Sequence, residues 1–175
     1  MSASRDPLAN PEPLIRRVYA YVAYRIGDGA DAEDVTSDVF ERALRYRESY
    51  DRGKGEPAAW LIGIARRSVD SHLAARPPIP AELVDTVAPG DLEEAASTRL
   101  DLARALGTLD ERDRELLALR YGADLSARQI GELLGQRTNT VEVALHRALG
   151  RLRRALERDD PSPAEAPVLK PEVSP

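Results

Sequence analysis

The chain has 175 residues, a formal net charge of −5 at pH 7 and no cysteine. This length suits one domain or two small ones, and the lack of cysteine excludes disulfides, thiol catalysis and thiolate metal sites. The negative charge argues against a protein that coats nucleic acid without sequence preference, since such proteins are usually basic. Any contact with DNA must therefore be local, or be helped by a larger partner.

Signatures of membrane proteins and of enzymes are missing from the sequence. No basic segment followed by an apolar run opens the chain, and no apolar run approaches the roughly 20 residues that span a bilayer. The two histidines, His72 and His146, lie far apart, and there is no Gly-rich phosphate loop, metal-spaced ligand set or nucleophile constellation. We therefore expect a cytoplasmic protein that is not an enzyme and that needs no metal or cofactor.

The first part of the chain predicts three helices. Apolar residues recur at helical spacing from Leu14, and this first helix is expected to end at Gly27. Asp31 is expected to cap a second helix, whose first turn carries acidic residues that suit the helix dipole. After a loop, Pro57 suits the first position of a third helix. Residues 14–75 are therefore predicted to form a compact three-helix lobe.

The rest of the chain predicts a linker, a second helical lobe and a tail. Residues 76–90 contain four prolines and cannot form a continuous helix, so they are predicted to be a linker. Asp91 is expected to cap a helix that runs to about residue 106, and Asp110 to start another that ends at Gly122. The second lobe spans 91–158, and the Pro-, Ala- and Glu-rich tail over 159–175 is expected to be disordered. The predicted fold class is all-α, with two small lobes that fold independently.

The end of the second lobe has the form of a helix-turn-helix. Ser126 and Gln129 have the spacing of a capping box, and Gly135 is a natural end for this short helix. Thr138 or Asn139 can cap a longer helix, which has an apolar stripe and an excess of arginine over glutamate. Such a helix can enter the major groove while its arginines meet phosphates. The alternative is an ordinary helical hairpin, but the charge bias favours DNA binding.

Together, the two lobes resemble regions 2 and 4 of bacterial RNA polymerase sigma factors. The segments that carry the resemblance are 32–35, 39–43 and 59–66 in the first lobe, and 106–109, 113–121 and 140–153 in the second. A chain with only these two regions and a short linker is similar to the extracytoplasmic-function (ECF) subgroup. The resemblance covers about residues 14–156 and implies a subunit that directs core RNA polymerase to promoters.

The resemblance implies two surfaces that bind core polymerase. The second helix would dock on the β′ clamp through Asp34, Asp38, Glu41 and Arg42. The alternative for these residues is a solvated helix face with pairs inside the helix. An apolar surface of the second lobe would seat the β flap through Leu116, Leu117 and Tyr121. The alternative for these residues is ordinary packing within the lobe, which must bury part of that surface.

The loop before the third helix, and that helix itself, correspond to the part of such proteins that melts and captures the downstream (−10) promoter element. Unstacked bases need aromatic faces, and their phosphates need cations. The residues that meet this need are Tyr50, Arg52, Lys54, Arg66 and Arg67. Trp60 is expected to belong to the core instead.

The helix-turn-helix would read the upstream (−35) element. Contacts to phosphates at the start of its second helix are expected from Thr138, Asn139 and Thr140. Val143, His146 and Arg147 are expected to face bases, and Arg151 and Arg154 to reach the flanking backbone. Glu142 and Ala144 sit where many relatives carry basic residues. This departure lowers the positive charge near the start of the helix and leaves most of the DNA affinity to core polymerase.

The leading hypothesis is therefore a promoter-specificity subunit with core RNA polymerase and promoter DNA as partners. An anti-sigma factor is a possible further partner. The alternative is a stand-alone helix-turn-helix regulator with a sensing or dimerising N-terminal bundle, which predicts a dimer and a palindromic site. The first lobe shows no apolar ligand pocket that its sequence would indicate, and this disfavours the regulator. An enzyme is the least favoured hypothesis, because no catalytic motif is present.

Overall fold

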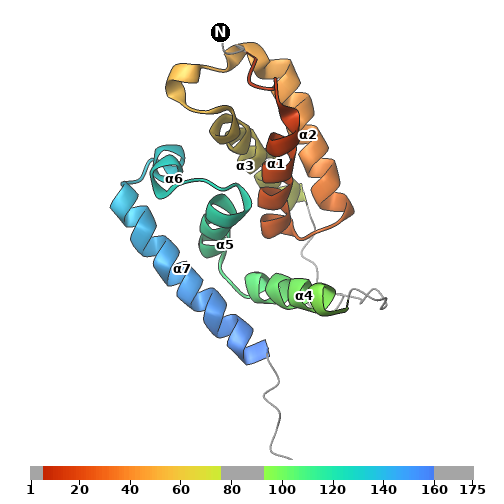
Figure 1. Ribbon diagram of the computed structural model, residues 1–175, viewed down its shortest axis with the longest axis vertical. Coiled ribbons are helices and arrows are strands. Elements are labelled where there is room, and N and C mark those ends of the chain that lie inside the picture. Colours follow the sequence, from red (N-terminus) through yellow and green to blue (C-terminus); the bar gives the residue numbers. More distant parts are fainter. Residues whose placement is uncertain (1–5, 76–92, 160–175) are drawn as a thin grey trace, which may run out of the picture.

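The computed structural model describes residues 6–75 and 93–159, and every regular element within them is helical. Figure 1 shows two groups of helices, one from each part of the chain, packed side by side. The predicted all-α class is confirmed. The predicted linker over 76–90 lies outside the described residues, as does the predicted tail apart from residue 159, which ends the last helix.

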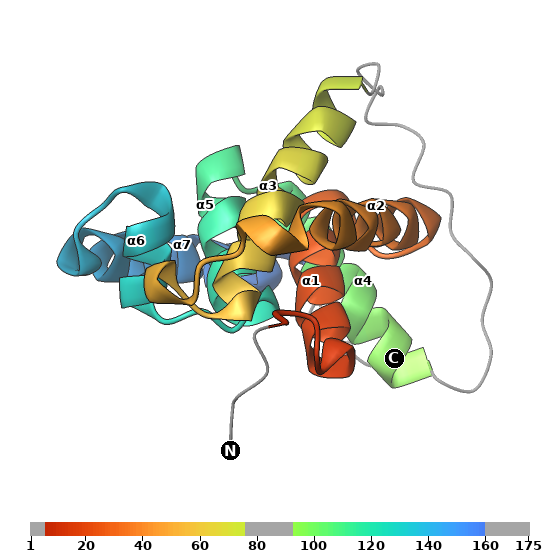
Figure 2. The same ribbon diagram turned by 90° about the horizontal axis from the view of Figure 1, so that it is seen from above.

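Three helices and a loop with two short 3₁₀ turns form the first lobe. In chain order these elements are α1 (Pro11–Ile26), α2 (Ala30–Tyr46), η1 (Arg47–Ser49), η2 (Arg52–Lys54) and α3 (Pro57–Ala75). Pro11 and Pro57 open their helices, where the missing proline N–H leaves no intrahelical hydrogen bond unmade. The three helices pack on one another, as Figure 2 shows.

The start of α2 differs from the prediction. Gly29, not Asp31, is the N-cap of α2, and Asp31 lies in the first turn. The expectation that Asp31 caps this helix is therefore wrong. Gly27 and Gly29 both have positive φ, at 93° and 125°, so two glycines complete the turn and let the helix begin earlier.

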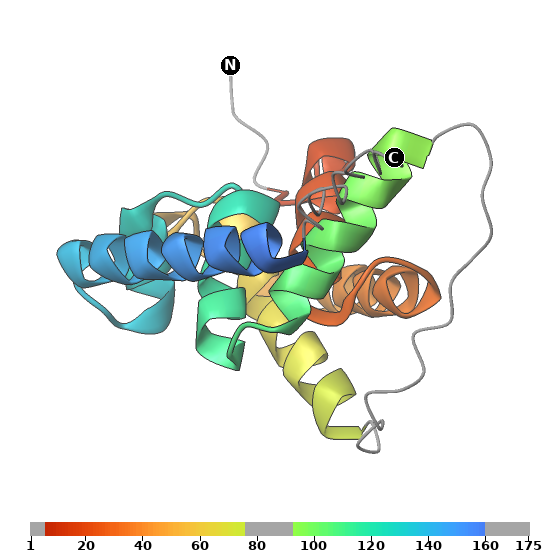
Figure 3. The ribbon, with the colours of Figure 1, turned by 90° about the horizontal axis from the view of Figure 1, so that it is seen from below.

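The second lobe contains the remaining elements. These are α4 (Glu93–Gly107), α5 (Glu111–Leu117), η3 (Ala118–Gly122), α6 (Ala127–Leu134) and α7 (Thr138–Asp159). Figure 3 shows α7 running past α5 to α4, and it also packs on α6. Among the helices of 6–75 and 93–159, none has both the length and the apolar character that a membrane crossing requires.

The predicted helix-turn-helix is present, and its first helix, α6, has the predicted caps. The Ser126 N–H donates to Gln129 Oε1 at 2.8 Å, and the Gln129 N–H donates to Ser126 Oγ at 3.2 Å. This reciprocal pair is a capping box, which satisfies two otherwise free N–H groups. Gly135 ends α6 with a left-handed φ of 66°. The expectation that Thr138 or Asn139 caps the second helix is wrong, because α7 already begins at Thr138 and the Val141 N–H donates to the Arg137 carbonyl at 3.1 Å.

The helix predicted from Asp110 to Gly122 is divided in two. Asp110 caps α5 by accepting the Asp113 N–H at 2.8 Å, as expected, but α5 ends at Leu117. A single π-helical turn, η3, follows, and the Ala123 N–H reaches back five residues to the Ala118 carbonyl at 2.9 Å. Because a π-turn has an extra residue, it changes which side chains face inward, and such turns occur often at functional sites.

One hydrophobic core joins the two lobes. Val18 and Tyr21 of α1 and Leu61 of α3 are fully buried in the same cluster as Leu119 and Leu125 of the second lobe. Burying one large apolar side chain is worth about 1.5–3 kcal/mol, so this shared core contributes strongly to the packing of lobe on lobe. The contact between the lobes includes α1 of the first lobe, which lies against η3 of the second. The boundaries of the two lobes remain a prediction.

Substitution of Ser126 by alanine tests the capping box. We expect Ser126→Ala to lower the free energy of unfolding by about 1 kcal/mol, because the Gln129 N–H loses its acceptor. Urea denaturation followed by circular dichroism measures this change. Ser37→Ala is the matched control, because the Ser37 hydroxyl only donates to the Glu33 carbonyl on the exposed side of α2. Equal losses in the two variants would contradict the role of the box.

Candidate nucleic-acid interface

The outer face of α7 is the most open of the predicted DNA surfaces. Val141, Ala148 and Leu152 turn one side of α7 into the protein, and the opposite side is solvent-exposed. Gly131 fixes how α6 meets α7, because a Cβ at this position would lie only 2.6 Å from the Gln136 carbonyl oxygen. The turn therefore folds tightly over α6 and sets the direction in which α7 presents its outer face.

The structure brings the predicted upstream-element residues together on this outer face. The exposed members are Thr138, Asn139, Thr140, Val143, His146, Arg147, Arg151 and Arg154. Arg151 is already engaged, since its Nη1 donates to Asp113 Oδ2 at 2.5 Å. The Asp113 side chain is only 7% exposed, so this ion pair anchors α7 on α5. A phosphate contact by Arg151 remains a prediction.

The predicted downstream-element residues lie around a structured loop. The Asp51 carboxylate accepts the Gly53 N–H at 2.9 Å, and the Tyr50 hydroxyl donates to the Gly55 carbonyl at 3.0 Å. The Tyr50 ring packs against Trp60, with centroids 5.4 Å apart and planes tilted by 58°. Two neighbouring aromatic faces are what a site for unstacked bases requires.

Trp60 is the residue of this region that sequence reasoning did not place at the site. It was expected in the core, and it does pack against the core, but it is only half-buried and lines a cleft. The feature of the sequence that could have indicated this role for Trp60 is a pair of aromatic residues that flank a loop with two glycines. That signal is weak, because a lone tryptophan on a helix is usually a packing residue.

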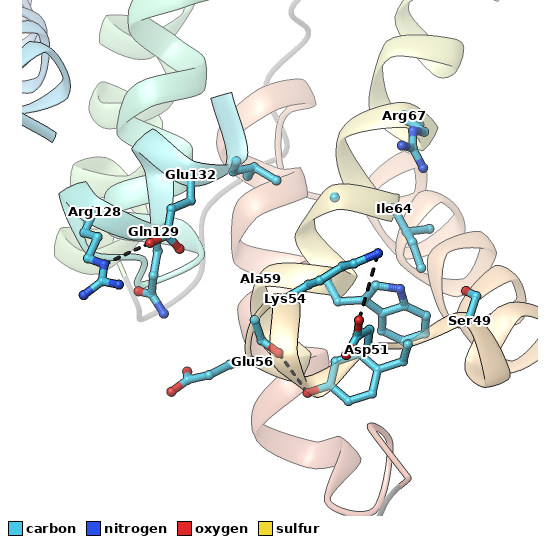
Figure 4. Close-up of a pocket in the computed structure, with 15 residues that line it drawn as sticks. Ser49, Asp51, Lys54, Glu56, Ala59, Ile64, Arg67, Arg128, Gln129 and Glu132 are labelled. Carbon is cyan, nitrogen blue, oxygen red and sulfur yellow. Dashed lines mark hydrogen bonds and ion pairs between the residues drawn. The ribbon is translucent and has the colours of Figure 1, made fainter. Parts of the chain in front are cut away.

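A cleft of about 580 Å³ separates the loop and α3 from α6. Figure 4 shows Lys54 and Asp51 on the loop, and Arg128 and Glu132 on α6 across the cleft. Both pairs form ion pairs, at 4.0 Å and 2.9 Å. Arg67 also lines the cleft, and the predicted Arg52 is exposed on the same loop.

Arg66, the remaining residue of the downstream set, points at the second lobe. Its Nε donates to Glu115 Oε1 of α5 at 2.7 Å, and its side chain is 28% exposed. In this conformation a carboxylate of the second lobe therefore takes the position on Arg66 that a phosphate would take. Arg66 is not among the residues that line the cleft, and its guanidinium is engaged by Glu115.

Arg25 is an interface residue that sequence reasoning missed. Its side chain is only 2% exposed, and it donates to the Tyr21 hydroxyl at 2.8 Å and to Glu111. Asp70 and Glu115 lie 3.4 and 3.6 Å from its nitrogens. A single arginine on an otherwise apolar helix face gives little signal in a sequence, since long cationic side chains usually extend to solvent.

The charges around Arg25 keep it ionised despite its burial. Burial acts to lower the pKa of Arg25, but Tyr21, Glu111 and Glu115 raise it above its ordinary value. Burial raises the pKa of Tyr21 to about 12, so its hydroxyl stays neutral. A buried arginine that stays charged must keep its carboxylate partners.

The predicted clamp-binding residues differ in their accessibility. Asp34 and Glu41 are exposed on α2. Asp38 accepts from Arg42 Nε at 3.0 Å and from the Ser68 hydroxyl at 2.9 Å, so it helps to hold α2 on α3. The outer face of α2 therefore offers two carboxylates that a partner can reach directly.

The predicted flap-binding residues are mostly enclosed. Leu116 and Leu117 are 2% and 0% exposed, and only Tyr121 is accessible, at 51%. Tyr121 borders a groove with His146 and Leu149 of α7. In the part of the chain that the structure describes, no cluster of three metal-ligating side chains comes together.

Two family models match the chain, and together they cover both lobes. The model described as Sigma-70 region 2 matches residues 12–76, and the one described as Sigma-70, region 4 matches residues 99–152. The match to region 4 includes α5, η3, α6 and most of α7. Each model thus coincides with one of the two helical groups.

Curated relatives are similar over most of the chain. The chain is 29% identical to the ECF RNA polymerase sigma factor BldN of Streptomyces coelicolor over 81% of this chain, which spans only 57% of BldN. It is 31% identical to ShbA of Streptomyces griseus, over 89% of this chain and 88% of that protein. It is 28% identical to SigW of Bacillus subtilis, over 80% and 83%. Each of these relatives is described as an ECF RNA polymerase sigma factor.

Solved structures share the fold. The sigma factor RpoE of Bartonella quintana, in complex with the anti-sigma factor NepR, matches with a TM-score of 0.65 and 22% identity, over 85% of this chain and 94% of that one. CnrH in complex with the cytosolic domain of CnrY matches with a TM-score of 0.61 and 22% identity, over 87% and 86%. The arrangement of both helical groups is thus seen in known structures.

Proposed function

The chain belongs to the ECF subfamily of RNA polymerase sigma factors, which direct transcription initiation with RNA polymerase, and we propose that it selects promoters through the outer face of α7. The observation that carries this proposal is the exposed row from Thr138 to Arg154 opposite the buried stripe of α7. In that row, Val143, His146 and Arg147 lie where they can contact base edges in the major groove. Arg154 lies farther along and contacts the flanking phosphates.

The first lobe binds the downstream element in this proposal. The support is the pairing of Tyr50 with Trp60 beside a cleft, with Arg52, Lys54 and Arg67 around it. Aromatic faces stack unpaired bases, and cations track the strand. Residues 14–75 thus form the unit for the −10 element, and residues 91–158 form the unit for the −35 element.

Core polymerase holds both units in the working complex. We assign the β′ clamp contact to the outer face of α2, supported by the exposure of Asp34 and Glu41, with Asp38 and Arg42 at its edge. Tyr121 is the accessible part of the flap-binding surface, and Leu116 and Leu117 join it only if the second lobe rearranges.

We also propose a cytoplasmic location and regulation by an anti-sigma factor, the class of protein bound to RpoE in its solved complex. The net charge of −5 supports a dependence on polymerase, because an acidic chain has little general affinity for DNA. The alternative of a stand-alone regulator is disfavoured, because both lobes match sigma regions and the first lobe has its own exposed cations.

Reconstitution tests the proposed function directly. The purified chain is mixed with bacterial core RNA polymerase, and transcription start sites are mapped on genomic DNA. We expect a defined set of starts that share two sequence elements at a fixed separation. Binding of the chain alone to a palindromic site as a dimer, with no new starts, would favour the stand-alone regulator.

Charge reversal on α2 tests the clamp contact. We expect Asp34→Arg with Glu41→Arg to weaken competition with another sigma factor for core enzyme. The loss should be modest, about 0 to 1 kcal/mol for each rim pair. Asp38 is kept, because it bonds Ser68 of α3. The control is Glu142→Arg with Glu157→Arg on α7, which changes the net charge equally and leaves α2 unaltered. If the Asp34 and Glu41 double variant competes like the unaltered chain at physiological salt, or loses no more than the control, α2 is not the docking surface.

Two arginine variants separate base contacts from phosphate contacts on α7. Arg147→Ala should lower the binding free energy for the preferred promoter by roughly 1 to 3 kcal/mol, and it should weaken the base preference at one or two positions of the upstream element. Arg154→Ala should weaken all promoters about equally and reduce the salt slope by about one unit. Transcription from a library randomised at the upstream element measures both effects.

Arg112→Ala is the control for this pair, because Arg112 is exposed on α5, away from the outer face of α7. An Arg147→Ala holoenzyme that selects the same upstream sequence as the unaltered one would show that Arg147 does not contact bases. If neither variant changes transcription on any upstream sequence, the second lobe serves only to bind polymerase.

A further inference from the structure

Gly150 lies in the middle of α7, and nothing within the described residues requires a glycine there. Glycine lowers the stability of a helix interior relative to alanine, because it loses more conformational freedom on folding. An added Cβ at Gly150 would have no atom within 4 Å, and the φ of this residue lies outside the left-handed region. At Gly131, in contrast, a Cβ would collide with the Gln136 carbonyl oxygen. The fold would therefore accept alanine at position 150, and the glycine has no packing role.

Gly150 lies on the outer face of α7. Figure 1 shows α7 along one edge of the structure, and Gly150 follows the exposed Val143 by two helical turns on the same side. At a rise of about 1.5 Å per residue, the two positions are about 10 Å apart along the helix. The major groove is about 12 Å wide. When Val143 meets base edges, Gly150 therefore lies near the sugar–phosphate wall of the groove.

Basic side chains surround Gly150 on the helix surface. Its neighbours three and four positions away are His146, Arg147, Arg153 and Arg154. All four are exposed, and within residues 6–75 and 93–159 none of them is paired with a carboxylate, unlike the adjacent Arg151. A position without a side chain is thus enclosed by side chains that can bind an anion.

The direction of helical side chains brings Arg154 over Gly150 and favours the same for Arg153. Side chains of an α-helix point back toward its N-terminus, so each covers the turn before its own Cα. Accordingly, the Arg154 Nε donates to the Gly150 carbonyl at 3.3 Å. This bond uses one of the five N–H groups of the guanidinium, and the other four are left for a ligand. Gly150, Arg153 and Arg154 therefore border a notch whose floor is the helix backbone.

A phosphodiester fits this notch. A guanidinium matches the geometry of a phosphate and can bind two of its oxygens at once. A DNA backbone is bulky, so it needs the close approach that a missing side chain permits. The notch also continues the row of exposed residues that begins at Thr138, which favours DNA over an acidic protein surface as its ligand.

We propose that Gly150, Arg153 and Arg154 form a notch that seats one backbone phosphate of the promoter beside the upstream element. The missing side chain lets the phosphate approach the backbone of α7, and the two guanidiniums bind its oxygens. Arg153 thereby joins Arg154 in contacting the DNA backbone. A phosphate held in this way carries no sequence information, but it sets how far α7 enters the groove. This assignment rests on the proposed −35 function.

Promoter binding by the reconstituted holoenzyme tests the notch. Gly150→Leu fills the notch with a residue that favours a helix more than glycine does, and Arg153→Ala removes one guanidinium. The controls are Gly107→Leu, at the exposed end of α4 where an added Cβ also has no atom within 4 Å, and Arg112→Ala on α5. Thermal unfolding followed by circular dichroism checks the fold, and Gly150→Leu should not lower its midpoint.

Affinity is measured by anisotropy of a fluorescein-labelled promoter over a range of salt concentrations. Phosphates around the upstream element are replaced one at a time by uncharged methylphosphonates. We expect Gly150→Leu and Arg153→Ala each to weaken binding about tenfold, through the loss of charge-assisted hydrogen bonds. Both should reduce the salt slope by about one unit, whatever the upstream sequence. One methylphosphonate should weaken the unaltered holoenzyme and have little further effect on Gly150→Leu.

Two outcomes would overturn the notch. The first is a folded Gly150→Leu holoenzyme that binds the promoter as tightly as Gly107→Leu does. The second is a loss of affinity in Gly150→Leu while every methylphosphonate keeps its full effect, because the leucine would then disturb a contact with polymerase instead of one with DNA.

A scrambled upstream element separates the notch from the −35 function. If the unaltered holoenzyme prefers the native upstream sequence and Gly150→Leu binds equally well, only the notch is rejected. If the unaltered holoenzyme binds both sequences equally while Gly150→Leu loses affinity and salt slope, the −35 function is rejected and the phosphate contact is supported.

Discussion

The close approach of α1 to η3 is the constraint on which the rest of this structure depends. Gly122 has no side chain, so the backbone of α1 can lie directly on the π-turn. This contact joins the apolar faces of two lobes into one core. It also accompanies the approach of the α5 carboxylates to Arg25 and Arg66. The position of one glycine thus governs both the packing and the charge pairing between the lobes.

Arginine serves two different purposes in this molecule. Arg25, Arg66 and Arg151 are bound by carboxylates of α5, and their pairing orients helices rather than ligands. Arg147 and Arg154 stay exposed on α7, where an incoming DNA phosphate or base can reach them. Under the proposed function, this division explains how an acidic chain can recognise DNA, because the affinity then comes from a few exposed cations on one helix face and from core polymerase.

The two proposed DNA surfaces also differ in how much they depend on the arrangement of the lobes. The outer face of α7 is built within the second lobe, by the capping box of α6, the close turn at Gly131 and the inward stripe of α7. The cleft beside Trp60 has one wall from each lobe, so its width follows the distance between them.

The sequence by itself determined the all-α class, the order of the helices, the helix-turn-helix, the caps of its first helix, and the family. These features depend on residues a few positions apart, such as Ser126 with Gln129, so their signal is local. Only the tertiary structure decided the burial of Arg25, the enclosure of Leu116 and Leu117, and the pairing of Arg66 with Glu115. It also decided that Trp60 lines a cleft and that a π-turn ends α5. Helical periodicity shows which face of a helix is apolar. It does not show which faces meet, because segments distant in sequence must pack together first. That packing also decides which charged side chains stay free to bind a partner.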